Sequence, residues 1–353
     1  MNLIDGVKTA ELKVSSETKE LSAFVKDKSK SLVDRLESFE DIINIEVGDT
    51  AMTRAKSLER EFDIRQLYIK YEGDNPSGTQ KDRIAFAQVY DALRRGFSTI
   101  SLATCGNYGV AVALAADLAG LECIIAIPSS YHTERIKEME SLSANIMRID
   151  GSYEDVVTKV SEMAVEHEWY DANPGGANTP LQIASYAQIA TEIVDDLGDA
   201  PEYCAVPVSN GTLLAGIYRG FASLYKRGKT SKIPKMIAAS STHKNPIIQS
   251  FKKGLDHCQD LQPEKVKETK YNEPLINWHS FDGEEALYAL LQSKGEAFNI
   301  SDKKMRDMST LLLKKEGLRI LPASTAGLIA LLELDEKMNF EPNRFVAVLT
   351  AKY

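Results

Sequence analysis

The sequence lacks the features that mark several classes of protein. It has no run of about 18 apolar residues, so we expect no membrane span. The first residues show neither the basic stretch nor the apolar core of a signal peptide. The 51 acidic residues outnumber the 42 basic ones, and a formal net charge of −9 argues against a general affinity for nucleic acid or anionic membranes. We therefore expect a cytoplasmic protein with no nucleic-acid or membrane partner.

Cysteine and histidine are also scarce. The 4 cysteines lie far apart, share no CxxC spacing, and 3 of them occupy apolar segments. This pattern favours reduced, buried thiols over a disulfide framework or a zinc site. The 5 histidines are scattered along the chain. We assign none of them to catalysis, and we expect no metal.

Apolar runs alternate with amphipathic segments along most of the chain. Residues 98–104, 122–128 and 345–350 are predicted to be buried strands, and residues 152–168 an amphipathic helix with a serine and acids at its start. Continuous apolar strands alternating with helices are typical of parallel sheets covered on both faces. With 353 residues, the sequence predicts an α/β protein with two lobes.

Three stretches depart from this rhythm or precede it. Residues 1–30 are rich in lysine, serine and glutamate, and composition leaves open whether they are mobile or contact a partner subunit. Residues 31–43 have apolar positions at helical spacing and predict a short helix. Residues 256–278 predict a long surface excursion.

The first loop that could carry chemistry is NPSGTQKDR, which places Lys81 at the start of a predicted helix. A cation is unfavourable there, because the helix N-terminus already carries positive dipole charge. The lysine is therefore either turned to solvent beside Asp82 and Arg83, or used in chemistry such as Schiff-base formation. A lowered amine pKa would free its lone pair for that reaction. The loop alone leaves both interpretations open.

Two further loops join a predicted strand to a helix. The loop at Thr104, Gly106 and Asn107 offers backbone N–H groups and an amide donor to an anion, or it supplies only a helix cap. Residues 209–212 have the arrangement that holds a phosphate on backbone amides, although a simple turn has the same pattern. No lysine of the nucleotide-binding type follows, so we do not expect a nucleoside triphosphate.

The last candidate is Thr350, at the end of the final predicted strand. Its hydroxyl is suited to hydrogen-bond a heterocycle nitrogen, or it is an ordinary β-branched strand residue.

Taken together, these loops resemble those of a known family. Residues 70–83 (KYEGDNPSGTQKDR) and 103–121 (ATCGNYGVAVALAADLAGL) resemble the lysine and asparagine loops of pyridoxal-phosphate enzymes of fold type II, the tryptophan-synthase-β type. Within that group the chain resembles threonine synthase from about Gly48 to Thr350, through residues 194–211, 272–287 and 314–328. The resemblance implies two lobes, each a mostly parallel twisted sheet covered by helices.

The resemblance also implies domain boundaries. Residues 1–45 would form an N-terminal arm and helix, and residues 46–84 with 176–353 the larger, cofactor-binding domain. Residues 85–175 would form a smaller domain that moves to close the site. A homodimer is implied as well, to which the N-terminal arm could contribute.

Roles are carried over one position at a time. Lys81 would form the Schiff base with pyridoxal 5'-phosphate, and Asn107 would bond the cofactor's phenolic oxygen. Thr350 would face the pyridine nitrogen, and its neutral hydroxyl would favour elimination and replacement chemistry over transamination. The cofactor phosphate would be held by one loop and the substrate carboxylate by another, namely Ser209, Asn210, Gly211 and Thr212 for the phosphate, and Thr104, Cys105, Gly106 and Asn107 for the carboxylate.

The implied reaction is that of threonine synthase, which converts O-phospho-L-homoserine and water to L-threonine and phosphate. Arg135 resembles a basic residue that would bind the substrate phosphate at a helix start. The chain departs from the family at Thr79–Gln80, at the bulky Tyr108, and in residues 171–182, which contain no basic residue.

These departures keep other functions open. One alternative is another fold type II reaction on an amino-acid substrate: β-replacement or β-elimination on a serine or phosphoserine derivative, as in cysteate synthase or an ammonia-lyase. A third hypothesis is a non-catalytic member of the fold that acts as a binding or regulatory partner.

Overall fold

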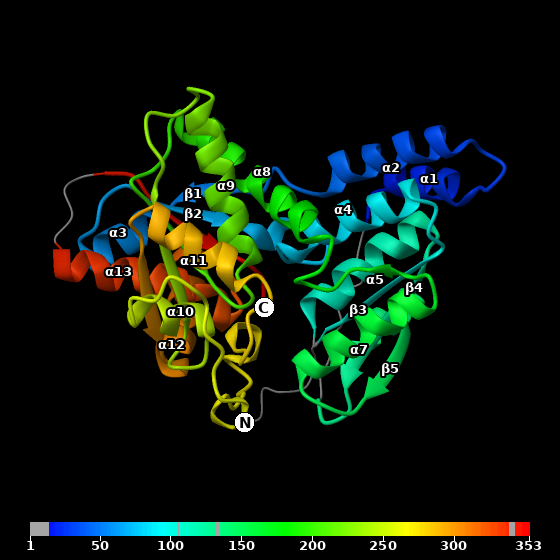
Figure 1. Cartoon of the computed structure of the whole chain (residues 1–353). Coiled ribbons are helices and arrows are strands. Elements are labelled where there is room, and N and C mark those ends of the chain that lie inside the picture. The colour runs from blue at the N-terminus through cyan, green and yellow to red at the C-terminus, as the bar shows by residue number, and fades with distance from the viewer. Residues whose placement is uncertain (1–13, 105, 132–134, 339–342) are drawn as a thin grey trace, which may run out of the picture. The chain divides into compact units, whose positions relative to one another are not determined.

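A computed structural model of the chain describes residues 14–104, 106–131, 135–338 and 343–353. The chain divides into two compact units (Figure 1). Unit 1 contains the described residues of Met1–Val47 together with Gln88–Asn173, and unit 2 contains Gly48–Ala87 and Pro174–Tyr353. Each unit contains a sheet and helices, as the α/β prediction requires. No helix in the described part of the chain combines the length and apolar character of a membrane span.

Unit 1 is built on a four-stranded parallel sheet with the order β5-β4-β3-β6. Its strands are β3 (Thr99–Ala103), β4 (Glu122–Pro128), β5 (Asn145–Ile149) and β6 (Tyr170–Asp171). Its helices are α1 (Ser16–Lys26), α2 (Leu32–Glu46), α5 (Asn107–Ala119), α6 (Ile136–Ser141) and α7 (Tyr153–Glu166), with the second half of α4 (Lys81–Arg94).

Local sequence explains the helices around this sheet. The α7 helix begins with the predicted serine and acids, because Ser152 and Asp155 form a reciprocal capping box. The α5 helix is almost wholly buried and rich in alanine and valine, and it ends at Gly120 in the left-handed conformation. Gly109 is needed within α5, since a Cβ there would lie 2.6 Å from the Thr104 side chain.

The N-terminal region that composition left open is partly described. The α1 helix packs against α2 and α5. The buried hydroxyl of Ser22 donates to the carbonyl of Leu118 on α5 at 2.9 Å. Residues 16–26 are thus a packed helix of unit 1.

Unit 2 is built on a six-stranded sheet with the order β1-β2-β10-β7-β8-β9. The β1 strand pairs antiparallel with β2, and every other pair is parallel. The strands are β1 (Met52–Arg54), β2 (Leu67–Tyr71), β7 (Tyr203–Pro207), β8 (Lys235–Ser241), β9 (Glu296–Ile300) and β10 (Phe345–Leu349).

Helices cover this sheet as predicted for parallel strands. The α-helices are α3 (Lys56–Phe62), the first half of α4, α8 (Thr179–Leu197), α9 (Thr212–Lys226), α10 (Pro246–Lys252), α11 (Gly283–Gln292), α12 (Asp302–Glu316) and α13 (Ala326–Met338). Short 3-10 helices are η1 (Glu72–Asp74), η2 (Pro263–Lys265), η3 (Glu273–Leu275) and η4 (Pro322–Thr325). The predicted excursion at residues 256–278 contains only the short η2 and η3 turns.

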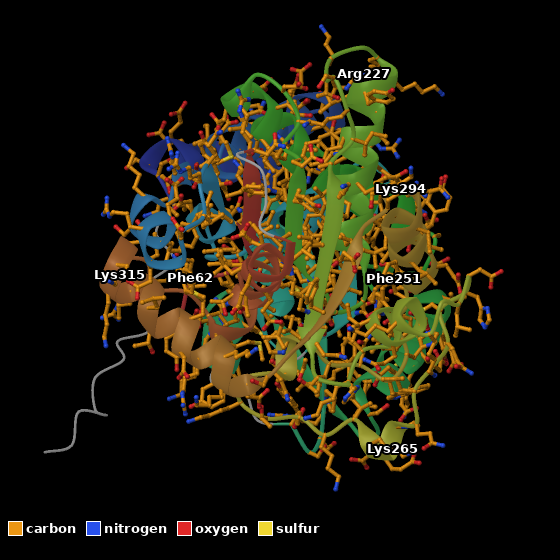
Figure 2. All side chains as sticks on the ribbon, turned by 90° about the vertical axis from the view of Figure 1, so that its left-hand side faces the viewer. Phe62, Arg227, Phe251, Lys265, Lys294 and Lys315 are labelled. Atoms are coloured by element: carbon orange, nitrogen blue, oxygen red, sulfur yellow. The ribbon has the colours of Figure 1, made fainter. Side chains whose placement is uncertain are left out.

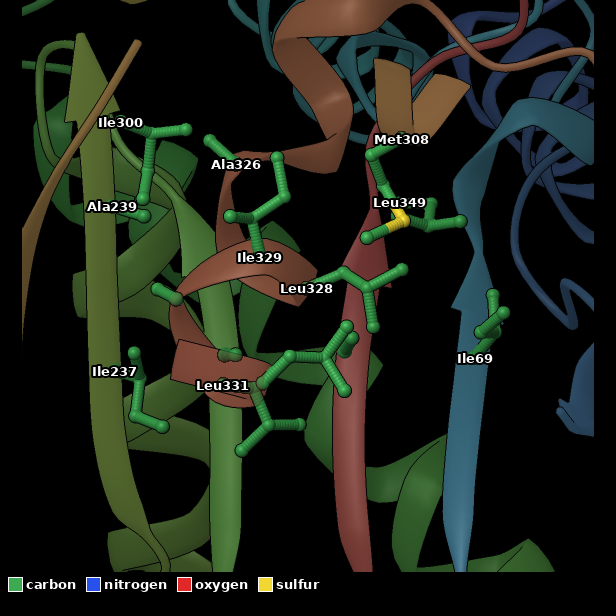
Figure 3. Close-up of a cluster of buried hydrophobic side chains, with 14 of the residues drawn as sticks. Ile69, Ile237, Ala239, Ile300, Met308, Ala326, Leu328, Ile329, Leu331 and Leu349 are labelled. Atoms are coloured by element: carbon green, nitrogen blue, oxygen red, sulfur yellow. The ribbon is translucent and has the colours of Figure 1, made fainter. Parts of the chain in front are cut away.

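The core of unit 2 forms where α13 packs across β7, β8 and β10 (Figure 3). Leu328 and Leu331 of α13 are fully buried, as are Ile237 of β8 and Leu349 of β10. The charged ends of long side chains such as Arg227, Lys294 and Lys315 lie instead at the periphery of this unit (Figure 2). The strands of this sheet are therefore closely packed against α13.

Three adjacent parallel strands of unit 2 lead into the predicted loops. The central order β2-β10-β7 places the carboxyl ends of these strands side by side. The chain leaves β2 toward Lys81, β10 toward Thr350, and β7 toward residues 209–212. Ligands of open α/β sheets bind outside the carboxyl ends of the strands, so the topology brings three of the predicted loops to one edge.

Candidate active site

The lysine loop is fixed by hydrogen bonds from its own residues. Lys81 is the first residue of α4, and its backbone N–H donates to the Thr79 hydroxyl at 2.9 Å. The backbone N–H and hydroxyl of Ser77 both donate to Asp82 at 2.9 Å. Asp82 and Arg83 are buried, so the interpretation of an exposed lysine among solvated charges is wrong.

Four buried charges anchor α4 beneath this loop. Arg83 forms a fork with Glu72 at 2.6 and 2.9 Å and a second fork with Glu192 at 2.7 and 2.8 Å. Lys70 pairs with Glu192 at 2.6 Å. Two cations thus balance two carboxylates, which gives a neutral cluster across β2, η1, α4 and α8.

Lys81 itself lies in an environment that favours its neutral form. Burial lowers the pKa of Lys81 to about 8, although the nearby charge of Asp282 acts in the opposite direction. An ordinary lysine has a pKa near 10.5. A far larger fraction of Lys81 is therefore an uncharged nucleophile near neutral pH.

The loop at residues 209–212 presents backbone donors. Two asparagines hold it from outside: Asn245 donates to the Ser209 carbonyl at 2.9 Å, and Asn277 donates to the Asn210 side chain at 3.1 Å. The Asn210 carbonyl accepts from the Asp282 N–H at 3.2 Å. Within the described residues, the N–H groups of Asn210 and Gly211 find no acceptor, so they are available to an anion.

Glycine is required at position 211. Gly211 has a φ of +101°, and a Cβ there would lie 2.8 Å from the Asp282 carbonyl and 2.7 Å from the Ala286 side chain. Thr212 follows as the first residue of α9. Its hydroxyl donates to the carboxylate of Asp282, which also accepts from Thr179 at 2.9 Å.

At the end of β10, Thr350 is buried beside a second hydroxyl. Its Oγ1 lies 2.8 Å from Oγ of Ser324 in η4. The Thr350 carbonyl accepts from the Gln80 N–H at 2.9 Å, which ties this strand end to the lysine loop. Lys81, Thr350 and residues 209–212 are therefore gathered in unit 2.

In unit 1 the asparagine loop joins β3 to α5. The Thr104 N–H donates to the Ala126 carbonyl at 3.0 Å, and the Thr104 hydroxyl accepts from the Gly106 N–H at 3.3 Å. Asn107 is the first residue of α5 and does not act as its N-cap. Cys105 lies outside the described residues.

Arg135 contacts this loop directly. Its Nη1 donates to Oδ1 of Asn107 at 2.5 Å, and its Nη2 pairs with Glu138 at 2.8 Å. The predicted cation and the predicted cofactor-binding amide are thus brought together, with a carboxylate beside them. Arg135 precedes α6, as the sequence predicted.

Tyr108 does not project from the loop. Its side chain is buried, its hydroxyl donates to the Ala172 carbonyl at 2.7 Å, and it accepts from the Gln88 amide. Burial raises the pKa of Tyr108 well above its ordinary value. The bulky residue is therefore part of the core of unit 1.

Sequence reasoning missed several residues of this site. Asp282 and Asn277 lie in segment 272–287, which was noted only as part of the resemblance, and Ser324 lies in segment 314–328. In the sequence, Asp282 is only an aspartate before a helical segment, and Ser324 is only a hydroxyl residue at a turn. Both patterns are common in proteins where these residues have no such role.

Comparison with known proteins identifies the class to which this fold and site belong. A family model described as "Pyridoxal-phosphate dependent enzyme" matches residues 43–351. The chain belongs to this family, and its fold is that of the fold type II enzymes.

The curated relatives are more specific. The chain is 28% identical over 328 residues to the threonine synthase of Methanocaldococcus jannaschii, which covers 92% of this chain and 76% of that protein. It is 27% identical over 294 residues to the threonine synthase of Methanosarcina acetivorans, covering 83% and 71% of the two chains.

Solved structures agree on the fold. A pyridoxal 5'-phosphate-dependent aspartate racemase superposes with a TM-score of 0.73 at 19% identity, covering 91% of this chain and 95% of that one. Maize serine racemase gives 0.71 at 17% identity, covering 91% and 94%. At these identities the structures establish the fold alone.

The cofactor of this chain is pyridoxal 5'-phosphate, and the residues of unit 2 fit it. The Lys81 amine, with its lowered pKa, is suited to react with the cofactor's aldehyde. The turn at Gly211 is suited to bind the phosphate, because Asn245 binds the Ser209 carbonyl and backbone N–H groups remain for the anion. The hydroxyl of Thr350 suits an uncharged ring nitrogen.

Proposed function

We propose that this protein is a threonine-synthase-like lyase that converts O-phospho-L-homoserine and water to L-threonine and phosphate. The observation that carries the proposal is the bond between Arg135 and Asn107, which puts a cation at the mouth of the asparagine loop. Such a cation is suited to bind a substrate that carries a phosphate group. The threonine synthases among the relatives support the same substrate.

The residues take the following roles in the proposal. Lys81 would hold the cofactor through Nζ, and its free amine would take the proton from the substrate's Cα. Pyridoxal phosphate, when bound, withdraws electrons from Cα and makes that proton removable. Residues 209–212 hold the cofactor phosphate on backbone N–H groups, and Thr350 donates to the ring nitrogen.

The remaining roles belong to unit 1. Asn107 donates its amide to the phenolic oxygen, because its Oδ1 is already occupied by Arg135. The loop from Thr104 to Asn107 binds the substrate carboxylate. Arg135 would bind the substrate phosphate. The phosphate would leave from Cγ as a Cβ proton is removed, Cγ would then be protonated, and water would add its hydroxyl to Cβ.

A second candidate function rests on the charge around Arg135. Glu138 pairs with this arginine at 2.8 Å, and residues 171–182 contain no basic side chain. A neutralised arginine suits a substrate without a phosphate, such as a serine derivative undergoing β-replacement or β-elimination.

Phosphate release separates the two candidates. The purified holoenzyme is incubated with O-phospho-L-homoserine, O-phospho-L-serine or O-acetyl-L-serine, and phosphate and amino-acid products are measured. We expect equal amounts of phosphate and threonine from O-phospho-L-homoserine, and none with Lys81→Ala. Turnover of a serine derivative with no threonine formed would contradict the proposal and favour the second candidate.

We also propose a homodimer in the cytoplasm and closure of a smaller domain at residues 85–175 over the substrate. Light scattering of the full chain and of a variant lacking residues 1–30 tests the dimer and any contribution from the N-terminal segment.

A further inference from the structure

Asp282 is an aspartate at a helix start that does not cap its own helix. It directly precedes α11, where an aspartate normally accepts from the first N–H groups of that helix. Its side chain makes no such bond. It accepts instead from the hydroxyls of Thr212 and Thr179 and from the Gly175 N–H.

These partners give the carboxylate the surroundings of a bound anion. Thr212 begins α9 and Thr179 begins α8, so the N-terminal ends of three helices meet at Asp282. The positive ends of helix dipoles and the hydroxyl donors together stabilise negative charge. Asp282 is only 3% exposed, so this negative charge belongs to the protein interior.

Asp282 and the cofactor's phosphate would both require the single proton of the Thr212 hydroxyl. A hydroxyl has one proton to donate, and an ionised carboxylate can only accept. While Asp282 is ionised, the Thr212 proton is committed to it, and a phosphate at residues 209–212 receives only backbone N–H groups. Two anions next to one another in a buried site favour protonation of one of them.

We propose that Asp282 competes with the cofactor phosphate for the Thr212 hydroxyl and takes up one proton from solvent when the phosphate binds. The protonated carboxyl is neutral and can itself donate, and Thr212 is released to donate to the phosphate. Cofactor affinity then falls as the pH rises. This inference rests on the placement of the phosphate at residues 209–212 in the proposed function.

Among the titratable groups around Asp282, Lys81 has a pKa of about 8 and would itself take up a proton beside a bound phosphate, so the test below is made in a Lys81→Met background. Lys81 on α4 favours the ionised carboxylate, whereas burial raises the pKa of Asp282 overall. The Cys258 thiol faces Gly283, and burial raises its pKa to about 12, so it stays neutral. The first turns of α8 and α9 carry no charged residue.

The remaining charged groups near this helix start are engaged elsewhere. Glu284 accepts from the Cys258 N–H at 2.8 Å, and Glu285 pairs with Arg219 of α9 at 2.5 Å. The His279 ring, on the segment before Asp282, lies within hydrogen-bond distance of Asp260, with Nδ1 2.9 Å from Oδ1.

Proton uptake on binding tests the proposal directly. The full-length protein carrying Lys81→Met, stripped of cofactor, is titrated by calorimetry with 4'-deoxypyridoxine 5'-phosphate, which has the phosphate and needs no Schiff base. Measurements run from pH 7.5 to 8.5, where the phosphate is fully dianionic because its second pKa is about 6. Buffers with different ionisation heats give the number of protons taken up.

We expect the Lys81→Met protein to take up about one proton more than the same protein carrying Asp282→Asn, with affinity falling by up to about tenfold per pH unit. Asp282→Asn in this background should bind about tenfold more tightly at pH 8 and lose this pH dependence. Glu285→Gln, which removes the same charge from the first turn of α11, should behave as the Lys81→Met parent. Equal proton uptake in the Lys81→Met parent and in its Asp282→Asn variant would overturn the proposal.

Two further variants keep the outcomes distinct. Thr179→Val removes a donor to the ionised Asp282 without touching the loop. It should therefore tighten binding while the uptake stays near one proton, even if Asp282→Asn fails to fold. An unchanged affinity in Thr179→Val would then count against the proposal. Gly211→Ala should weaken binding at least tenfold, and if it does not, the phosphate placement fails together with this inference.

Discussion

Arg135 donates from Nη1 to Oδ1 of Asn107 over 2.5 Å. The bond joins the residue before α6 to the first residue of α5, 28 positions apart in the chain. Because Oδ1 accepts from the guanidinium, the amide nitrogen of Asn107 is the end that donates to a ligand. One arginine thus orients the proposed cofactor contact and supplies the proposed substrate cation.

The first prediction separates these two roles of Arg135. Arg135→Met should lower kcat/KM for O-phospho-L-homoserine by about 100-fold, because a hydrogen bond to a charged group contributes about 1.5–3 kcal/mol. Cofactor affinity should fall less, by about fivefold, through the lost orientation of Asn107. Steady-state kinetics and cofactor titration measure the two effects. An equal loss on O-acetyl-L-serine would show that Arg135 acts only through Asn107.

The second prediction concerns the cost of the partial burial of Lys81. A folded-state pKa of about 8, against an ordinary 10.5, means that the folded state binds fewer protons than the unfolded state between these values. The penalty is fully present below pH 8 and disappears above pH 10.5. Lys81→Met should therefore raise the free energy of unfolding of the cofactor-free protein by about 3 kcal/mol at pH 7.

Urea unfolding at pH 7 and pH 10 measures this gain, which should shrink at the higher pH. Lys303→Met, at a side chain that is 80% exposed, is the matched control and should change little at either pH. A gain of equal size at both values would show that the extra stability comes from packing rather than from charge.

The third prediction concerns the buried cluster beneath the lysine loop. Glu192→Ala leaves Arg83 and Lys70 with one carboxylate, so it should lower the free energy of unfolding by about 3–5 kcal/mol. Glu61→Ala, which breaks an exposed pair with Lys315, should cost less than about 0.5 kcal/mol. Chemical denaturation of the two variants measures the difference.

The pH dependence of that cost gives an independent check. Burial alone would raise the pKa of Glu192, but hydrogen bonds and charge from Arg83 and Lys70 outweigh it and lower the pKa below 4.5. The stabilisation is therefore present above pH 4.5 and is lost as the pH falls through the folded-state pKa. The difference in the free energy of unfolding between the wild type and Glu192→Ala should therefore become smaller in acid. A difference that stays constant with pH would show that the ionised Glu192 is not its cause.

The fourth prediction concerns the hydroxyl pair at the end of β10. Thr350 donates to Ser324 in this structure. Donation to the ring nitrogen would reverse that bond and make Ser324 the donor to Thr350, so Ser324→Ala should weaken cofactor binding by about fivefold, the contribution of one hydrogen bond. Thr325→Val removes a neighbouring buried hydroxyl that bonds the Pro322 carbonyl instead. It should lower stability by about 1 kcal/mol without changing cofactor affinity. If Ser324→Ala and Thr325→Val bound the cofactor with equal affinity, Ser324 would have no role in the cofactor site.

Much of the architecture could be predicted from the sequence, because buried parallel strands are continuous apolar runs. The β10 strand is such a run, and all five of its residues are buried. The β9 strand was missed, since Glu296 is exposed and Asn299 half-buried at the edge of the sheet. The α1 helix was left open because few of its residues are apolar and only three are buried.

Residues of the candidate site could be predicted only where one short loop contains the complete sequence motif. Lys81 and residues 209–212 stand in short motifs at strand ends. Asp282 meets Thr212 across 70 positions, and Ser324 meets Thr350 across 26, so their contacts depend on how the strands are ordered. The burial of Arg83 likewise depends on partners elsewhere, above all on Glu192.

Covalent labelling of the lysine tests the central claim most directly. The holoenzyme is reduced with borohydride, digested, and its peptides are analysed by mass spectrometry. The account predicts the mass of the reduced cofactor on Lys81 alone, at stoichiometric yield, and no labelled peptide from Lys81→Ala. Label on another lysine, or an unlabelled Lys81 in protein that retains the cofactor, would contradict the assignment of this site.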